Sequence, residues 1–114
     1  MSRAAVYLDG MSELAALSAR LRAFAAARQW EPFHTPKNLA MALAGEAGEV
    51  VAELQWLSDA EITEGLADGP LKQRLADESA DVFLYLMQLA DASGIDLLAA
   101  AHAKMDRNEV RFPA

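Results

Sequence analysis

Glu46-Ala-Gly-Glu49 and Glu78-Ser-Ala-Asp81 are two short acidic motifs, and each stands inside an apolar pattern typical of a helix. Residues three apart lie on one face of a helix, so each motif places two carboxylates side by side. Two such helices packed together would bring four carboxylates to one place. The stretch from Glu46 to Asp81 therefore predicts both the centre of the fold and a cation site.

Apolar residues at helical spacing extend outward from both motifs. One helix is predicted for residues 36–57, with Thr35 as its N-cap and Pro36 at its first position. A second helix is predicted from residue 70 to Gly94, where a left-handed residue can end a helix. Residues 80–90 of this helix are apolar nearly all round, which indicates burial in a core or in an oligomer interface.

Gly45 and Gly48 stand within the first of these helices, on either side of Glu46. Each glycine costs about 1 kcal/mol relative to alanine in a helix interior. Two of them beside an acidic motif suggest that another backbone or a ligand comes close at this point.

Two further helices are predicted from the remaining apolar stripes. One covers residues 12–28, with Ser12 as its N-cap, after an irregular start over residues 1–10. The other covers residues 96–109, and a connector of one or two helical turns opens with a capping-box pattern at Ser58. The prediction is an all-α, four-helix bundle-like fold that is oligomeric.

The composition limits the domain number and the classes of partner. The 114 residues fit one domain, and a hydrophobic content of 54% with only four Pro and six Gly favours helices. A net charge of −7 argues against a surface for a nucleic acid polymer, because such surfaces neutralise phosphates with Lys and Arg. A small nucleotide whose phosphates are bridged to acidic residues by a metal ion remains compatible with this charge.

The chain contains no Cys, which excludes disulfides and thiolate metal sites within it. Its N-terminus lacks the apolar run of a signal peptide, and no uncharged stretch of 18 residues could span a bilayer. We therefore expect a soluble, cytoplasmic protein without a membrane partner.

The acidic motifs have a simple alternative interpretation as solvated helix faces, since Glu-x-x-Glu is common in amphipathic helices. Asp81, however, directly precedes Val82-Phe83-Leu84, so a compact fold would partly desolvate its carboxylate. Burying an unpaired carboxylate is costly unless a cation compensates for it. Oxygen ligands without Cys or a neighbouring His favour Mg²⁺, with Mn²⁺ as a substitute. The predicted metal ligands are Glu46, Glu49, Glu78 and Asp81.

A di-iron bundle is the nearest structural alternative, because it is also built from helical carboxylates. Such a bundle needs Glu-x-x-His on two of its helices. The two histidines here are His34, in a predicted loop, and His102, which has Ala99 three positions before it. The sequence therefore does not favour a di-iron site.

The acidic motifs also resemble the signature of the all-α nucleoside triphosphate pyrophosphatases, the MazG-like superfamily, and within it the dCTP pyrophosphatase branch. The resemblance covers residues 21–113 and includes Trp30-Glu-Pro-Phe-His-Thr-Pro-Lys-Asn38 and the pair Gln55-Trp56. It implies Mg²⁺-dependent hydrolysis of a nucleoside triphosphate to the monophosphate and pyrophosphate. The implied catalytic metal ligands are again Glu46, Glu49, Glu78 and Asp81, and one of these or Glu53 would accept the proton of the attacking water.

Substrate contacts are predicted at the ends of the helices. Lys104 and Asn108 share a helix face and could reach phosphates, although cations in a last helical turn also complement the helix dipole. The resemblance places Tyr85 beside the nucleotide, whereas a core aromatic is the alternative. Aromatic rings stack on nucleobases, and free N–H groups in a first helical turn favour anions. The corresponding candidates are Trp30, Phe33, His34 and Trp56 for the base, and Lys37 and Asn38 for an anion.

The sequence departs from the resemblance in the first helix, at Leu21, where a histidine is expected near the base pocket. We predict a homodimeric or homotetrameric enzyme that removes deoxynucleoside triphosphates, with dCTP or a modified dCTP favoured. One alternative is a helical regulatory or oligomerisation module that binds a nucleotide and Mg²⁺ without hydrolysis. Another is a structural bundle with solvated acidic motifs, which would show no metal-dependent shift in melting temperature.

Overall fold

The computed structural model describes residues 3–114, with the backbone alone described for residues 3–12 and 68. Within this range the chain forms five α-helices and one 3-10 turn, without a β-strand, which confirms the predicted all-α class. No described helix by itself is long and apolar enough to cross a membrane; one pair of helices, bent by 99°, meets the length and composition criteria together. The elements are α1 (Arg3–Ala27), η1 (Glu31–Phe33), α2 (Pro36–Leu54), α3 (Asp59–Asp68), α4 (Pro70–Ala92) and α5 (Leu97–Arg111).

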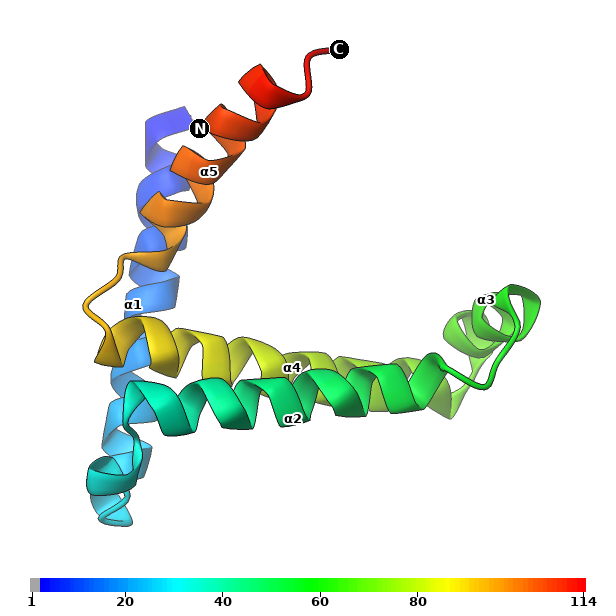
Figure 1. The fold of residues 1–114 in the computed structure, drawn as a ribbon, viewed down its shortest axis with the longest axis horizontal. Helices are drawn as coiled ribbons and strands as arrows, with labels where there is room; N and C mark the ends of the chain where they lie inside the picture. The colour runs from blue at the N-terminus through cyan, green and yellow to red at the C-terminus, as the bar shows by residue number, and fades with distance from the viewer. Residues whose placement is uncertain (1–2) are drawn as a thin grey trace.

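The body of the molecule is the antiparallel pair of α2 and α4, which pack along their length (Figure 1). α1 crosses one end of this pair, and α3 lies at the other end. After α4 the chain turns by 99° into α5, which leaves the pair as a separate arm. The helix axes thus run in two directions, one shared by α2 and α4 and the other followed by α5.

The predicted helix caps are confirmed. Thr35 and Asp96 each accept a hydrogen bond from the backbone N–H three residues further on. Ser58 and Glu61 form the complete capping box at the start of α3. Gly94 has a φ of 68°, the left-handed conformation that was predicted for it.

Four predicted boundaries differ from the structure. α1 begins at Arg3 and passes through Ser12, because the single glycine in this region, Gly10, costs only about 1 kcal/mol and does not end a helix of good helix formers. Residues 1–2 lie outside the described range. α2 ends at Leu54 rather than residue 57, because the extended N-cap Ser58 requires a break before α3. α3 is ten residues long instead of one or two turns, and α5 continues to Arg111 instead of residue 109.

One chain buries little apolar surface. The buried hydrophobic side chains are Ala25, Leu39, Leu71, Met87 and Ala90. The accessible surface is 8477 Å², compared with about 6,100 Å² for a compact monomer of this mass. The radius of gyration is 17.1 Å, compared with about 13 Å for a compact domain of this length.

The second half of α4 illustrates this deficit. The sequence predicted that residues 80–90 are covered all round, yet Phe83 is 40% exposed and Val82 is only half-buried. The other helices of the same chain reach α4 from one side and its ends. Within one chain this segment is therefore buried on one side only: Met87 and Ala90 belong to the core, and Phe83 does not.

Candidate metal centre

Three carboxylates meet where α2 and α4 pack together, a place that we call the acidic seam. Glu46 on α2 and Glu78 and Asp81 on α4 each bring one oxygen atom within 4.8 Å of the others. Glu46 and Glu78 are half-buried, and Asp81 is exposed. Three carboxylate oxygens at this spacing suit a hard divalent cation. The helix pairing thus brings the two acidic motifs together as the sequence predicted.

Glu49 lies outside this group of three and is exposed. Its charge nevertheless acts on the seam. Burial raises the pKa of the Glu78 carboxyl, and the charges of Glu49, Asp81, Glu46 and Glu53 raise it further, in that order. Glu49 has a larger effect than Asp81 although Asp81 belongs to the same helix as Glu78. Glu49 stands on α2, whereas Glu78 stands on α4.

Glu53 has a basic partner. The Arg74 Nε atom on α4 donates a hydrogen bond to the Glu53 Oε2 atom on α2 over 2.9 Å. The Glu53 side chain is 22% exposed, so this ion pair links the two helices at the border of the seam. Because a guanidinium already engages its carboxylate, Glu53 is less suited than Glu49 to accept a proton from water.

The structure brings no other backbone of this chain close to Gly45 or Gly48, and the alternative of a ligand stays a prediction. A Cβ atom at either position would meet no atom of this chain within 4 Å, apart from its own helix. At Gly65 on α3, by contrast, a Cβ atom would lie 2.8 Å from the Leu71 Cδ2 atom. Gly65 is therefore the glycine that allows a second helix to approach, while Gly45 and Gly48 leave open space beside Glu46.

The predicted aromatic base contacts fall into two separate places. At one end of α2, Trp30 packs edge-on against Phe24 and His34, with ring centroids 5.6 and 6.4 Å apart. Trp56, which is 85% exposed, follows the other end of α2. The 19 residues of α2 lie between them and span about 28 Å. One chain therefore does not join Trp30 and Trp56 in one pocket, and Phe33 is likewise 67% exposed.

The predicted phosphate contacts on α5 lie away from the seam. Lys104 is exposed and Asn108 is half-buried. Because α5 turns 99° from α4, the helix rise places Lys104 on the order of 20 Å from Asp81. A lysine side chain of the same chain does not cover that distance. Tyr85, in contrast, is half-buried on α4 one turn beyond Asp81, on the face that carries the seam.

Asn38 has a structural role at the start of α2. Its Nδ2 atom donates a hydrogen bond to the Phe33 carbonyl oxygen over 3.0 Å, and its backbone N–H donates to Thr35 Oγ1. These bonds hold η1 against the first turn of α2. Lys37, beside it, is exposed. The predicted anion contact is thus unsupported for the Asn38 side chain, which already has a partner.

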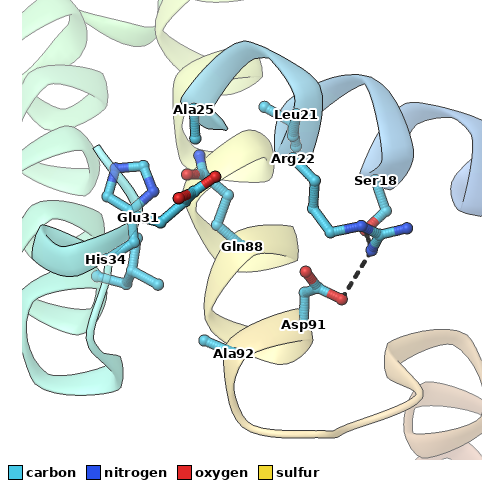
Figure 2. Close-up of a pocket in the computed structure, with 10 residues that line it drawn as sticks. Ser18, Leu21, Arg22, Ala25, Glu31, His34, Gln88, Asp91 and Ala92 are labelled. Atoms are coloured by element: carbon cyan, nitrogen blue, oxygen red, sulfur yellow. Dashed lines mark hydrogen bonds and ion pairs between the residues drawn. The ribbon is translucent and has the colours of Figure 1, made fainter. Parts of the chain in front are cut away.

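A cavity of about 250 Å³ lies between α1, η1 and the facing ends of α2 and α4 (Figure 2). The sequence did not predict this cavity. One signal for the cavity is present in the sequence, because Gln88 is the polar residue in the otherwise apolar segment 82–90. We call this cavity the α1–α4 pocket. Residues that line it include Leu21, Arg22, Glu31, His34, Leu39 and Gln88.

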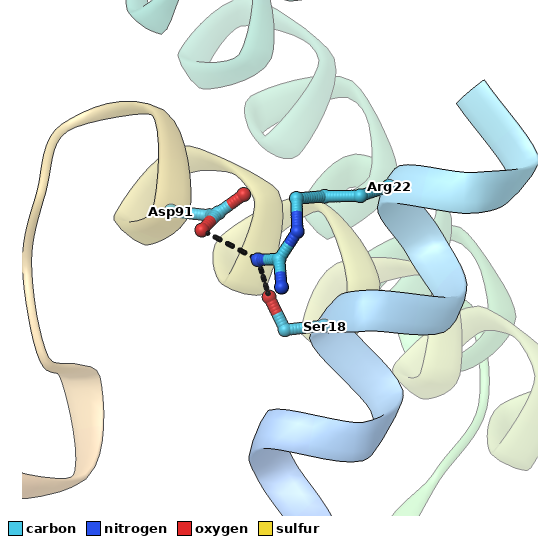
Figure 3. Close-up of polar contacts among 3 residues, drawn as sticks. All are labelled: Ser18, Arg22 and Asp91. Carbon is cyan, nitrogen blue, oxygen red and sulfur yellow. Dashed lines mark hydrogen bonds and ion pairs between the residues drawn. The ribbon is translucent and has the colours of Figure 1, made fainter. Parts of the chain in front are cut away.

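An ion pair closes one side of the α1–α4 pocket (Figure 3). The Arg22 Nη1 atom donates hydrogen bonds to Asp91 Oδ1 over 2.9 Å and to Ser18 Oγ over 3.1 Å. The two charged side chains are 58% and 41% exposed, so the pair contributes less than about 1 kcal/mol to stability. Its main effect is to fix the arginine head group at the rim.

Comparison with known proteins gives consistent matches, although no family model matches the chain. The chain is 47% identical over 92 residues to dCTP pyrophosphatase 1 of Mus musculus, covering 79% of this chain and 53% of that protein. It is 44% identical over 91 residues to dCTP pyrophosphatase 1 of Homo sapiens, covering 80% and 54%. The chain thus spans about half the length of these curated relatives.

A solved structure matches over more of its length. The crystal structure of a pyrophosphatase from Archaeoglobus fulgidus has a TM-score of 0.83 to this chain and is 36% identical to it. The match covers 90% of this chain and 94% of that chain. The resemblance that the acidic motifs indicated is therefore confirmed over most of the sequence.

Proposed function

Because the chain belongs to the all-α nucleoside triphosphate pyrophosphatase (MazG-like) superfamily, with the dCTP pyrophosphatases, we propose that it is a nucleotide pyrophosphohydrolase. It cleaves a (deoxy)nucleoside triphosphate, with dCTP or a modified dCTP favoured, to the monophosphate and pyrophosphate. The observation that carries this proposal is the convergence of Glu46, Glu78 and Asp81 within 4.8 Å at the acidic seam.

In this proposal the seam holds Mg²⁺, for which Mn²⁺ is the usual substitute. The bound ion would neutralise phosphate charge and lower the pKa of a water molecule. Glu46, Glu78 and Asp81 supply its protein ligands. The pKa of Glu78 is raised first by burial and then by the neighbouring carboxylates, whose repulsion a cation would relieve. Glu49, at the edge of the group, accepts the proton of the attacking water. Tyr85, one turn from Asp81, borders the bound nucleotide.

The same proposal includes self-association as a homodimer or homotetramer. Lys104 and Asn108 are out of reach of the seam of their own chain, Trp56 lies at the opposite end of α2 from Trp30, and the exposed area exceeds that of a compact monomer by about 2,400 Å². A second copy would cover this apolar surface and bring these side chains to the seam. Light scattering that returned the 12.3 kDa monomer at working concentration would contradict this part.

The decisive assay is pyrophosphate release from a panel of triphosphates, with Mg²⁺ and with a chelator in its place. We expect Mg²⁺-dependent release, with dCTP or a modified dCTP among the best substrates. Absence of turnover for every member of the panel would exclude the proposed activity. Saturable nucleotide binding without product would then identify a regulatory nucleotide-binding module instead.

A further inference from the structure

An ion pair closes one end of the acidic seam. On α2, Glu53 follows Glu46 by seven residues. On α4, Arg74 precedes Asp81 by seven. Seven residues are close to two helical turns, so the members of each pair share a helix face and are separated by about 10 Å along the axis. Because α2 and α4 are antiparallel (Figure 1), the contact of Glu53 with Arg74 lies two turns along the seam from Asp81, toward α3.

The spacing of the first acidic motif continues to Glu53. Glu46, Glu49 and Glu53 are three and four residues apart, and residues at these spacings are neighbours on a helix surface. On α4, Glu78 follows Arg74 by four residues and so lies one turn nearer to the centre of the seam. Glu53 therefore stands where a further carboxylate ligand would extend the acidic group toward α3.

The contact with Arg74 keeps the Glu53 carboxylate out of that group. The Arg74 Nε atom donates a hydrogen bond to Glu53 Oε2 over 2.9 Å. A carboxylate that accepts a hydrogen bond from a guanidinium has its charge offset and part of its lone pairs occupied, so it binds a cation less well. The Glu53 side chain is also better covered than that of Arg74, at 22% exposed against 52%. Accordingly, Glu53 is not in the group of three whose oxygen atoms meet within 4.8 Å.

We propose that Arg74 is a positioning residue that withholds Glu53 from the metal ion and thereby limits the number of divalent cations at the acidic seam. This inference rests on the proposed function and adds a residue that shapes its metal centre. Mg²⁺ must keep coordination positions open for water and for substrate phosphates. A freed Glu53 carboxylate would join Glu49 and Glu78 in a second acidic group, which would bind an additional cation and compete for those positions.

The test counts the Mn²⁺ ions bound per chain, from the electron paramagnetic resonance signal of free Mn²⁺ and without nucleotide. The proteins are the wild type, Arg74→Met and the double variant Glu53→Gln/Arg74→Met. We expect Arg74→Met to bind about one ion more than the wild type, because the freed carboxylate completes a further oxygen site. The double variant should return to the wild-type number, because that carboxylate is gone.

Two further variants control for charge and for folding. Arg74→Lys should keep the wild-type number of ions, because an ammonium group can also pair with Glu53. Lys72→Met removes the same charge from an exposed position of α4 that points away from Arg74, and it should also keep that number. Arg74 is 52% exposed, so its replacement does not endanger folding, and circular dichroism checks the helix content.

Pyrophosphate release from dCTP separates positioning from direct contact with the substrate. We expect Arg74→Met to lower kcat/KM about tenfold, because the additional ligand takes a position that a phosphate needs. The double variant should regain most of this loss. Low activity in both variants would show that Arg74 or Glu53 itself acts on the substrate and would overturn the positioning role.

The Mn²⁺ count separates this inference from the proposed function, because it needs no turnover. An unchanged number of ions in Arg74→Met, with pyrophosphate released by the wild type, would overturn the role of Arg74 and leave the hydrolase intact. The expected numbers of ions without release from any triphosphate would support the role of Arg74 and contradict the hydrolase.

Discussion

The acidic seam and the α5 arm differ in how much of the proposed site one chain builds. At the seam, Glu46, Glu78 and Asp81 come within 4.8 Å because α2 and α4 pack along their length. On the arm, Lys104 and Asn108 stand on the order of 20 Å away because α5 turns 99° from α4. Packing within one chain thus brings the three carboxylates together, whereas in our proposal the phosphate contacts come from a second chain.

The largest expected effect comes from replacing a carboxylate of the acidic seam. Asp81→Asn should lower kcat/KM at least about 100-fold, because changes even outside the ligand set of a metal site cost 10–100-fold. Initial rates of pyrophosphate release at saturating Mg²⁺ measure it. Glu64→Gln, on an exposed glutamate of α3, is the control and should retain full rates. Wild-type turnover by Asp81→Asn or Glu49→Gln would remove the catalytic role of the seam.

Removing the charged group of Lys104 on α5 should lower activity less, and a second chain should be able to restore that activity. Lys104→Ala should lower kcat/KM about 10–100-fold, because a hydrogen bond to a charged group contributes about 1.5–3 kcal/mol. Mixing Lys104→Ala with Asp81→Asn should restore part of the activity, since a mixed oligomer contains one intact seam facing one intact arm. Arg107→Ala, on the same helix, is the matched control.

The mixing experiment also tests the comparison between the two regions. If the mixture stays as inactive as its components while both variants associate, then seam and arm do not act across chains. Lys104 would in that case act on its own chain or have no part in the site.

A third expected effect concerns stability without metal. The pKa of Glu78 is raised above its ordinary value of 4.5, first by burial and then by the neighbouring carboxylates. A raised folded-state pKa gives stabilisation that is complete below the unfolded value and is lost as pH rises through the folded one. Glu78→Gln should therefore raise the Tm of the metal-free protein at pH 7 and reduce the dependence of Tm on pH above 4.5.

Mg²⁺ provides the counterpart of this measurement. It should raise the Tm of the wild type by binding the folded state and raise that of Glu78→Gln less. A lower Tm for metal-free Glu78→Gln than for the wild type would show that the repulsion at the seam is not significant. Glu64→Gln again serves as the control.

The smallest expected effect lies outside both regions, at the cap of α3. Ser58→Ala should lower the free energy of unfolding by about 1 kcal/mol and leave kcat/KM within about twofold. The hydrogen bond from the Ser58 backbone N–H lowers the pKa of Glu61, so this contribution is present above pH 4.5 and is lost as pH falls through the lowered value. Urea unfolding of Ser58→Ala at pH 7 checks the first statement, and urea unfolding of Glu61→Gln at pH 7 and pH 3 checks the second. Equal losses at the two pH values would contradict the role of the capping box.

Local signals in the sequence predicted the parts of the fold that local interactions decide. Thr35, Ser58, Asp96 and Gly94 each act within a few residues, and each was placed correctly. The prediction of an irregular start over residues 1–10 is wrong for residues 3–10, because a single unfavourable glycine does not outweigh the helix formers around it. At Gly45 and Gly48 no other backbone of this chain comes close, because the spacing of glycines does not say which helix packs against them, and the alternative of a ligand stays a prediction.

The sequence by itself determined an all-α chain with two acidic helices, because carboxylates three residues apart share a helix face whatever the helix packs against. It also indicated the family, through the residues that surround these motifs. The tertiary structure alone decided that α2 and α4 pair along their length, that α5 turns away, and that Gln88 faces a cavity two turns from Asp81. Those features depend on the direction that each helix takes after a turn, and contacts between residues far apart in the sequence set that direction.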